Sequence, residues 1–207
     1  MIRASILLLA ACAAAGCSGA PGGNDQAAAV ADDPVAAANS SFVSPNLAGG
    51  SWAGVFADPQ SSIDHFNRIG LRVGPYEKMG DSWRAEAVPT AMTDPSAPNL
   101  VQALFTAAGS ENALQRVTFT LVEPIAANDQ QARDQFDAWM TQALSQLGVP
   151  GGDTAVAAIH GQKRLTGALK GGAEYAVTRE TTPTERHVAV TFSRAAPITS
   201  GRAAAAS

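Results

Sequence analysis

The chain has 207 residues, of which 46% are hydrophobic, 6% aromatic and 15% charged, and its formal net charge is −4. This length suits one domain, or two small similar halves, and the hydrophobic fraction is large enough to form a core. Because basic residues are not in excess, we do not expect nucleic acid as a partner. Cys12 and Cys17 are the only cysteines, so neither a disulfide in the later chain nor cysteine-ligated zinc is expected.

The first residues have the three parts of a secretory signal peptide. Arg3 supplies a positive charge, an apolar run occupies residues 6–11, and small residues continue through Gly16. The apolar stretch at residues 4–15 covers about 12 residues, whereas a membrane-spanning helix needs about 20. We therefore predict that residues 1–16 are a cleaved signal peptide and not a transmembrane anchor.

The small residues end on a cysteine in a pattern that resembles the lipobox of bacterial lipoproteins, which is an aliphatic residue, two small residues and then Cys. Residues 14–17, Ala-Ala-Gly-Cys, leave a signal of ordinary length and are followed by the polar Ser18. Residues 9–12, Leu-Ala-Ala-Cys, fit the pattern better but leave a very short signal. We favour Cys17 as the lipid-attachment residue and keep Cys12 as the alternative. An ordinary cleaved signal with incidental cysteines is the remaining alternative.

This resemblance implies diacylglycerol on the cysteine sulfur, cleavage before that residue, and acylation of the new amino group with a chain such as palmitate. Several acyl chains, at about 0.8 kcal/mol per buried methylene, hold a protein firmly on a bilayer. In this family an Asp after the lipidated cysteine is associated with retention at the inner membrane, and Ser18, or Ala13 in the alternative, stands there instead. The resemblance therefore implies a protein of the bacterial cell envelope, anchored in the outer membrane and facing the periplasm.

Low-complexity segments flank the part of the chain that can form a core. Residues 17–50 are mostly Ala, Gly, Asn, Asp, Ser and Pro and have no sustained hydrophobic period. Such a segment buries too little apolar surface to offset its ordering entropy, so we predict a disordered tether. About 30 flexible residues reach roughly 30 Å. The tether would carry a folded domain at residues 51–194, and residues 195–207 are predicted to be a flexible C-terminal tail.

The first half of this domain predicts one helix followed by strands. Asp58 and Pro59 are typical of a helix start, and Gly70 is typical of a helix end. A helix is therefore expected over residues 59–69. Alternating apolar and polar residues predict strands near residues 71–73, 76–79, 83–88, 100–107 and 114–122, of which the last two form a hairpin.

The second half predicts a longer helix followed by more strands. Asn128 and Gln131 have the spacing of a capping box, and Gly148 is typical of a helix end. Apolar residues recur every three or four positions between them, which predicts a helix over residues 128–147. Residues 156–159 fit either a short helix or a strand. Further strands are expected at residues 163–169, 173–179 and 187–194.

The two halves, residues 58–124 and 128–194, run in the same order of helix, strands and hairpin. The alternating patterns at residues 117–121 and 188–192 line up, but identity is low and alternating strands resemble one another by chance. The sequence therefore leaves an internal duplication open. The order of elements predicts an α+β fold in which an antiparallel sheet packs on two helices. Small secreted inhibitor and binding modules look similar, but such a fold-level analogy carries little about function.

No motif in the sequence indicates a particular enzyme. The three histidines, His65, His160 and His187, are far apart in the sequence and belong to no metal-binding pattern. We therefore expect no metal and no cofactor. Acidic and basic residues gather in and around the last hairpin, and we interpret them as solvated charges on an open sheet face: Glu174, Arg179, Glu180, Glu185 and Arg186. The sequence thus predicts no catalytic residue.

Binding is the function that the sequence favours. Trp52, Tyr76, Trp83 and Tyr175 provide more aromatic area than a small core needs, and Tyr and Trp are enriched at interfaces. The alternation of polar and apolar residues nevertheless favours a core position for Trp83 and Tyr175. We expect a non-enzymatic binding or accessory module whose partner is an unidentified envelope protein or a small ligand. The alternative is a periplasmic hydrolase whose site is built from residues distant in the sequence.

Overall fold

The computed structural model describes residues 50–195. The predicted signal peptide, both candidate lipid-attachment cysteines, nearly all of the tether and most of the tail lie outside these residues. The described helices are α1 (Trp52–Ala57), α2 (Pro59–Arg68), α3 (Gln130–Leu147) and α4 (Gly152–Ile159). The described strands are β1 (Glu77–Met79), β2 (Ser82–Glu86), β3 (Thr90–Ala91), β4 (Gln102–Ser110), β5 (Ala113–Pro124), β6 (Thr166–Leu169), β7 (Ala173–Thr181) and β8 (Glu185–Arg194).

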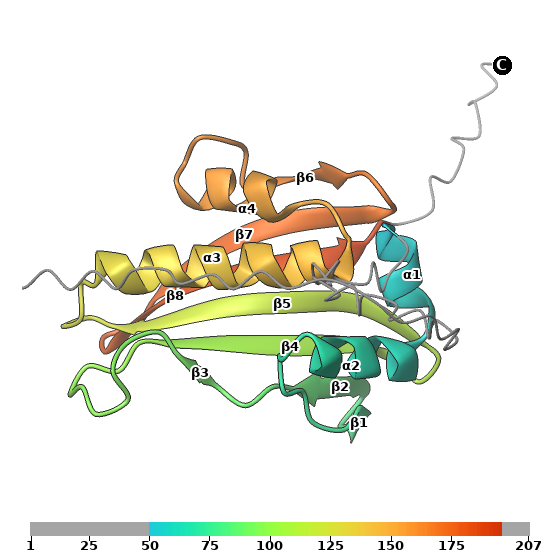
Figure 1. The fold of residues 1–207 in the computed structure, drawn as a ribbon, viewed down its shortest axis with the longest axis horizontal. Helices are drawn as coiled ribbons and strands as arrows, with labels where there is room; N and C mark the ends of the chain where they lie inside the picture. Colours follow the sequence, from blue (N-terminus) through green and yellow to red (C-terminus); the bar gives the residue numbers. More distant parts are fainter. Residues whose placement is uncertain (1–49, 196–207) are drawn as a thin grey trace, which may run out of the picture. The chain divides into compact units, whose positions relative to one another are not determined.

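The strands form one antiparallel sheet in the order β1-β2-β4-β5-β8-β7-β6, and β3 pairs with β4 on the same edge as β2. The long strands β5 and β8 lie at the centre, where Phe119 is opposite Val190. The β4–β5 hairpin and the β7–β8 hairpin therefore meet in the middle of the sheet, and the shorter strands form its two edges (Figure 1).

All four helices pack on one face of this sheet (Figure 1). Three of them make aromatic contacts with it, with these distances between ring centroids: Trp52–Phe192 at 4.8 Å from α1, Phe66–Phe105 at 5.0 Å from α2 and Trp139–Phe119 at 5.4 Å from α3. The short helix α4 contacts β7 and buries Ala155 and Ala158. Because alternate strand residues point to the same face, the apolar set of each strand lies beneath these helices and forms the core.

The ends of α2 follow the local signals in the sequence. The side chain of Asp58 accepts hydrogen bonds from backbone N–H groups of the first turn, and Pro59 occupies the first helical position. After the helix, Gly70 has a φ of +88°, and the N–H of Leu71 returns to the carbonyl of Phe66 at 3.0 Å. Leu71 is buried, so this turn also adds to the core. The helix predicted over residues 59–69 is confirmed except at its last residue.

The start of α3 differs from the prediction. Asp129, and not Asn128, caps the helix by accepting a hydrogen bond from a first-turn N–H at 3.0 Å, so the capping box with Gln131 is wrong. Both residue types can cap, and a tertiary contact decides between them, because the N–H of Asp129 donates to the buried carboxylate of Glu123. The end is as expected, with Gly148 in the left-handed conformation at a φ of 70°.

The β4–β5 hairpin is tighter than the sequence indicates. The segment at residues 108–113 reads as a loop, but β4 runs to Ser110 and β5 starts at Ala113. The pairing contains a β-bulge between Ala108 and Gly109. A Cβ atom on Gly109 would lie 2.2 Å from the carbonyl oxygen of Ala113, so only glycine fits at this bulge.

The predicted α+β class with an antiparallel sheet is confirmed, and two short helices, α1 and α4, join α2 and α3 on the covered face. Residues 156–159 belong to α4. Residues 71–73, predicted as a strand, contribute only an isolated bridge between Val73 and Ala87. The sheet order places the hairpins of the two predicted halves next to each other, while their origin by duplication stays a prediction.

Candidate functional site

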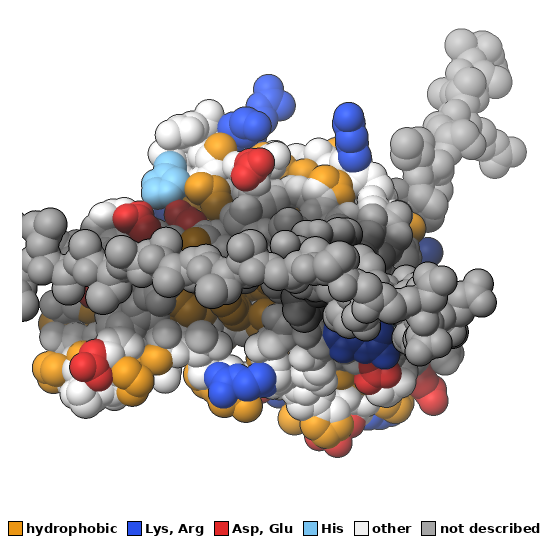
Figure 2. Space-filling view, in the orientation of Figure 1, with side chains coloured by type: hydrophobic (Ala, Val, Ile, Leu, Met, Phe, Trp, Pro, Cys, Tyr) orange, Lys and Arg blue, Asp and Glu red, His pale blue; other side chains and the backbone are white. Residues whose placement is uncertain are grey.

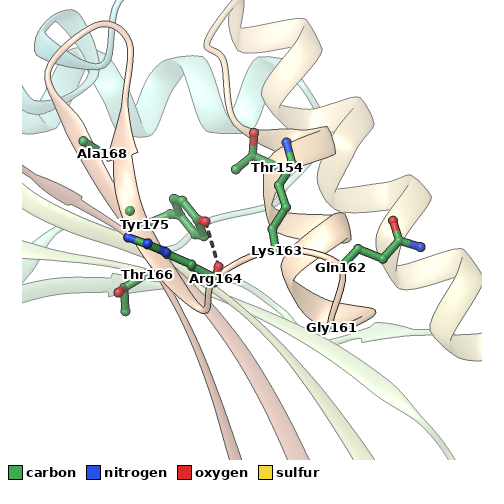
Figure 3. A pocket seen from close by; sticks show the side chains of 9 residues that line it. Thr154, Gly161, Gln162, Lys163, Arg164, Thr166, Ala168 and Tyr175 are labelled. Carbon is green, nitrogen blue, oxygen red and sulfur yellow. Dashed lines mark hydrogen bonds between the residues drawn. The ribbon is translucent and has the colours of Figure 1, made fainter.

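An open hollow of about 730 Å³ lies between α4, the loop that follows it, and β6 (Figure 3). It is lined by Thr154 of α4, residues 161–164 of the loop, residues 166–168 of β6 and Tyr175 of β7. We call it the α4–β6 hollow. Its lining includes one lysine, one arginine, two threonines and a glutamine beside apolar surface, so it is a mixed surface hollow with a positive charge.

Close packing between β6 and β7 forms one wall of this hollow. Tyr175 lies opposite Gly167 in the register of these strands, and a Cβ atom on Gly167 would lie 2.8 Å from the tyrosine ring. Glycine therefore allows the ring to lie over β6. The Tyr175 hydroxyl donates a hydrogen bond to the backbone carbonyl of Arg164 at 2.8 Å (Figure 3). Because Tyr175 is only 6% exposed, this bond fixes the end of the loop to the core.

The beginning of the loop is held by α4 and α3. The N–H groups of Gln162 and Lys163 donate to the carbonyl of Ala157 at 2.8 and 3.2 Å. The Nε2 atom of His160 lies 2.8 Å from the Oδ2 atom of Asp137, which is on α3. The loop is therefore attached at both ends, and its basic residues stand on a supported backbone.

The positive charges of the hollow are not neutralised within the described residues. Neither Lys163 nor Arg164 forms an ion pair in this part of the chain. Lys163 extends along α4 toward Thr154, whereas Gln162 points the other way (Figure 3). Figure 2 shows basic side chains projecting from the edge of the domain where α4 and β6 lie. The acidic Asp153, next to Thr154, lines a neighbouring hollow.

The Asp137–His160 pair is the second polar feature next to this loop. Burial raises the pKa of Asp137, which is 8% exposed, and the hydrogen bond with His160 opposes that rise. A histidine held by a buried carboxylate is also found in hydrolase triads, where the other ring nitrogen activates a nucleophile. Within residues 50–195, no hydroxyl hydrogen-bonds to His160. Nearby, the guanidinium of Arg179 donates hydrogen bonds to the carbonyls of Ala158 and Ile159 at the end of α4.

The remaining histidines are not brought together with these groups. His187 lies on β8 with its Nε2 atom 2.9 Å from Glu185, and His65 lies on α2. In the described part of the chain, no three His, Cys, Asp or Glu side chains gather in a group that could hold a metal ion.

Near the start of α3, a buried carboxylate binds two arginines. Glu123 is 5% exposed, and Arg133 Nη2 lies 2.8 Å and Arg186 Nη2 3.2 Å from its Oε1 atom. Burial raises the pKa of Glu123, but the hydrogen bonds from both arginines outweigh this effect and hold the pKa below its ordinary value. The cluster joins β5, α3 and β8. We interpret this cluster as structural, because both arginines pair with the same buried carboxylate.

The sequence interpretation of a charged open face is therefore only partly right. Glu174 and Glu180 are exposed and alternate with the buried residues of β7, as expected. Arg186 binds Glu123 on the covered face, and Arg179 caps α4 on that same face. The prediction is wrong for these two arginines, because strand alternation assigns each a face only once the register and helix positions are known.

No described helix covers the other face of the sheet. Thr106, Thr118 and Thr191 follow one another across β4, β5 and β8, and the hydroxyl oxygens of Thr118 and Thr191 are 3.1 Å apart. The adjacent open-face residues Ala108, Thr120, Ala189 and Ser193 are also small, whereas larger side chains stand among and beside them: Gln102, Leu104, Arg116, Val122 and His187. The middle of this open face therefore presents small residues, and its threonine hydroxyls can act as both donors and acceptors.

The aromatic residues divide between core and surface. Trp52 is fully buried, and its Nε1–H donates to the carbonyl of Pro150 at 2.8 Å. Tyr175 is also a core residue, as the alternation predicted. Tyr76 and Trp83 are partly exposed, with ring centroids 5.8 Å apart, near the β1–β2 edge. Only this second pair is available for an interface.

Cys17 and its alternative Cys12 lie outside the described residues, so lipid attachment stays a prediction. The α4–β6 hollow was not predicted, because residues 163–169 read as one strand, of which only residues 166–169 form β6. The available signal was the adjacent pair of basic residues between Gly161 and Gly167. Within residues 50–195, no helix is both long enough and apolar enough to cross a bilayer. No family model, no curated protein and no solved structure matches the chain.

Proposed function

We propose that this chain is a lipid-anchored protein of the bacterial cell envelope whose folded domain is a non-enzymatic binding or accessory module. The anchor would be acyl chains on Cys17, with Cys12 as the alternative. The location would be the outer membrane, with the domain facing the periplasm. The partner would be another envelope protein or a small ligand.

The observation that carries the binding role is the open face of the sheet. All four described helices lie on one side, and the small side chains of β4, β5 and β8 are left on the other. The small side chains in the middle of this face lose little conformational entropy when a partner covers them. The rows of threonine hydroxyls can bond to either donors or acceptors on such a partner.

Acyl labelling tests the anchor. Cells producing the full-length chain are fed a radioactive or clickable palmitate, and the protein is followed in membrane and soluble fractions. We expect Cys17→Ala to lose the label and the membrane association, and Cys12→Ala to keep both. Retention of the label by Cys17→Ala would move the site to Cys12, and retention by both variants would remove the lipoprotein proposal.

A single introduced cysteine tests the binding face, because the chain has no cysteine after Cys17. Thr120→Cys places a thiol on the open face, and Ala138→Cys places one on the exposed surface of α3 as a control. Maleimide labelling rates are compared between intact cell envelopes and the purified protein. We expect labelling at residue 120 to be at least about tenfold slower in envelopes, with residue 138 unchanged. Equal slowing at both positions, or none, argues against a partner on this face.

The alternative, a periplasmic hydrolase, is favoured by one observation, the Asp137–His160 pair. It predicts that the purified protein hydrolyses a generic ester such as p-nitrophenyl acetate faster than the same protein carrying His160→Gln. The binding proposal predicts no difference between the two. The same preparations also serve as a folding control, because circular dichroism reports whether His160→Gln retains the helices.

A further inference from the structure

We infer that the α4–β6 hollow is a binding site for a phosphate-bearing ligand. The inference goes beyond the binding face proposed above, because the hollow lies on the helix-covered side of the sheet and uses none of the open-face residues. It is carried by the combination of an open hollow, two basic side chains without an acidic partner in the described residues, and a loop that is attached at both ends.

Charge is the first argument. The chain as a whole is acidic, with a formal net charge of −4, yet two adjacent basic residues line this hollow. Arg133 and Arg186 are paired with Glu123 inside the fold. Lys163 and Arg164 form no ion pair within the described residues, which is also true of the exposed Arg68 and Arg116, but Lys163 and Arg164 are adjacent and line the same hollow.

The chemistry of the lining is the second argument. Lysine and arginine bind phosphate oxygens through charge-assisted hydrogen bonds, which are the strong ones. The hydroxyls of Thr154 and Thr166 add neutral donors on the same lining. No carboxylate is among the lining residues, since the nearby Asp153 lines the neighbouring hollow. The site therefore presents donors and positive charge, which fits phosphate oxygens and disfavours cations.

The third argument is that the loop carrying the two basic residues is already held in place. A ligand that must order a mobile loop loses affinity, whereas a loop already in place binds without that cost. The Tyr175 hydroxyl holds the carbonyl of Arg164, and the Asp137–His160 pair holds the residue at which the loop begins. Both anchors are side chains from the packed body of the domain. Lys163 and Arg164 are thus presented from a fixed backbone.

Two sources supply this chemistry next to a membrane: a phospholipid headgroup and a soluble phosphate. The full-length chain is titrated with pyrophosphate and, separately, with dihexanoyl phosphatidylglycerol below its micelle concentration, and binding is followed by ³¹P NMR line broadening. Stronger binding of the lipid assigns the site to a headgroup, and stronger binding of pyrophosphate assigns it to a soluble ligand. Either result supports a phosphate site, and binding of neither overturns it.

Charge-neutral variants locate the site. The double variant Lys163→Gln with Arg164→Gln should raise the apparent Kd of the better probe at least about tenfold. The matched control is Arg68→Gln with Lys78→Gln, which removes the same charge from two exposed residues of α2 and β1 that form no ion pair within residues 50–195, and it should change the Kd less than about twofold. Equal weakening in both variants means attraction by overall charge and overturns the proposal.

The side chains of Lys163 and Arg164 form no ion pair within the described residues, so the Gln double variant should melt at the wild-type temperature. Thermal melts of all variants check that weaker binding is not caused by unfolding. Tyr175→Phe gives a second, independent readout. It keeps both charges and releases the end of the loop, so weaker binding is expected in this variant as well. Full binding by Tyr175→Phe together with full binding by the Gln double variant would show that the probe binds elsewhere.

Discussion

The Nε2 atom of His160 lies 2.8 Å from the Oδ2 atom of Asp137 and joins the end of α4 to the middle of α3. The carboxylate is buried and the imidazole is partly exposed, with side-chain exposures of 11% and 40%. Arg179 binds the last carbonyls of α4 from β7, so this short helix is attached on two sides. The position of the loop beside the α4–β6 hollow therefore depends on polar contacts and not only on apolar packing.

The first prediction concerns the pH dependence of stability at Asp137. Because burial raises the pKa of this carboxyl, the folded chain binds its proton more tightly than the unfolded chain. Its contribution to the free energy of unfolding is present below about pH 4 and is lost as the pH rises through the folded-state pKa. We expect the unfolding free energy of the wild type, minus that of Asp137→Asn, to fall as the pH rises from about 3.5 to about 7.

Urea unfolding in steps of pH measures this difference. Ala138→Ser changes an exposed, uncharged neighbour on α3 and serves as the control, with a flat difference expected because neither side chain titrates. A difference for Asp137→Asn that grows with pH would mean that the ion pair with His160 outweighs the cost of burial.

The second prediction has the opposite sign and concerns Glu123. The hydrogen bonds from Arg133 and Arg186 lower its pKa despite burial, so its contribution to stability is present above the unfolded-state pKa and is lost as the pH falls through the folded-state pKa. Glu123→Gln leaves two arginines without their carboxylate and should cost about 3 kcal/mol at pH 7. The exposed pair Arg84–Glu86 provides the control, since Glu86→Gln should cost less than about 1 kcal/mol.

Chemical denaturation at neutral pH and at about pH 3 checks this prediction, because the cost of Glu123→Gln should shrink in acid. If both Glu variants cost the same at neutral pH, the Glu123 cluster adds no more than a surface ion pair does.

The third prediction concerns the β-bulge in the central hairpin. A methyl group at Gly109 would lie 2.2 Å from the carbonyl oxygen of Ala113, and that oxygen belongs to the backbone. Gly109→Ala should therefore lower the free energy of unfolding by about 1–3 kcal/mol, the usual cost of overpacking. Ala108→Ser, next to it on the open face, should stay within about 0.5 kcal/mol. Thermal unfolding separates the two variants, and equal melting temperatures would show that the bulge relaxes without cost.

The fourth prediction concerns the support of the loop at residues 161–164. Tyr175→Phe removes one hydrogen bond to the backbone of Arg164 and should cost about 1 kcal/mol of stability. Trypsin cleaves after Lys163 and Arg164, so the release of this loop should appear as faster cleavage there. Cleavage at the exposed Lys78 is the internal control and should keep its rate. Unchanged cleavage at the loop would mean that the other anchors hold it alone.

Local signals in the sequence predicted the elements whose ends are set by nearby residues. Asp58, Pro59 and Gly70 define α2, and Gly148 ends α3, because capping and left-handed backbone are interactions within a few residues. Strand alternation likewise predicted the long hairpins, since the period of two depends only on the strand itself. Helix α1 was missed, because six residues without a charged or strongly polar side chain are too few to show a helical period.

The candidate site was harder to predict, for a physical reason. The α4–β6 hollow exists because Tyr175 packs on Gly167 and reaches back to Arg164, and these contacts follow from strand register. The pairing of Asp137 with His160 likewise requires that α4 lie antiparallel beside α3, which no spacing in the chain states. The residue type shows that Lys163 is basic, but not whether an acidic side chain lies close enough to form an ion pair with it.

The sequence by itself determined the α+β class and the ends of α2, because each depends on composition or on neighbours along the chain. Tertiary structure alone decided that Asp129 caps α3, that Arg186 turns inward to Glu123, and that the two basic residues of the loop stay unpaired beside a hollow. Each of these outcomes depends on which distant groups reach one another, and that follows from sheet register and helix packing.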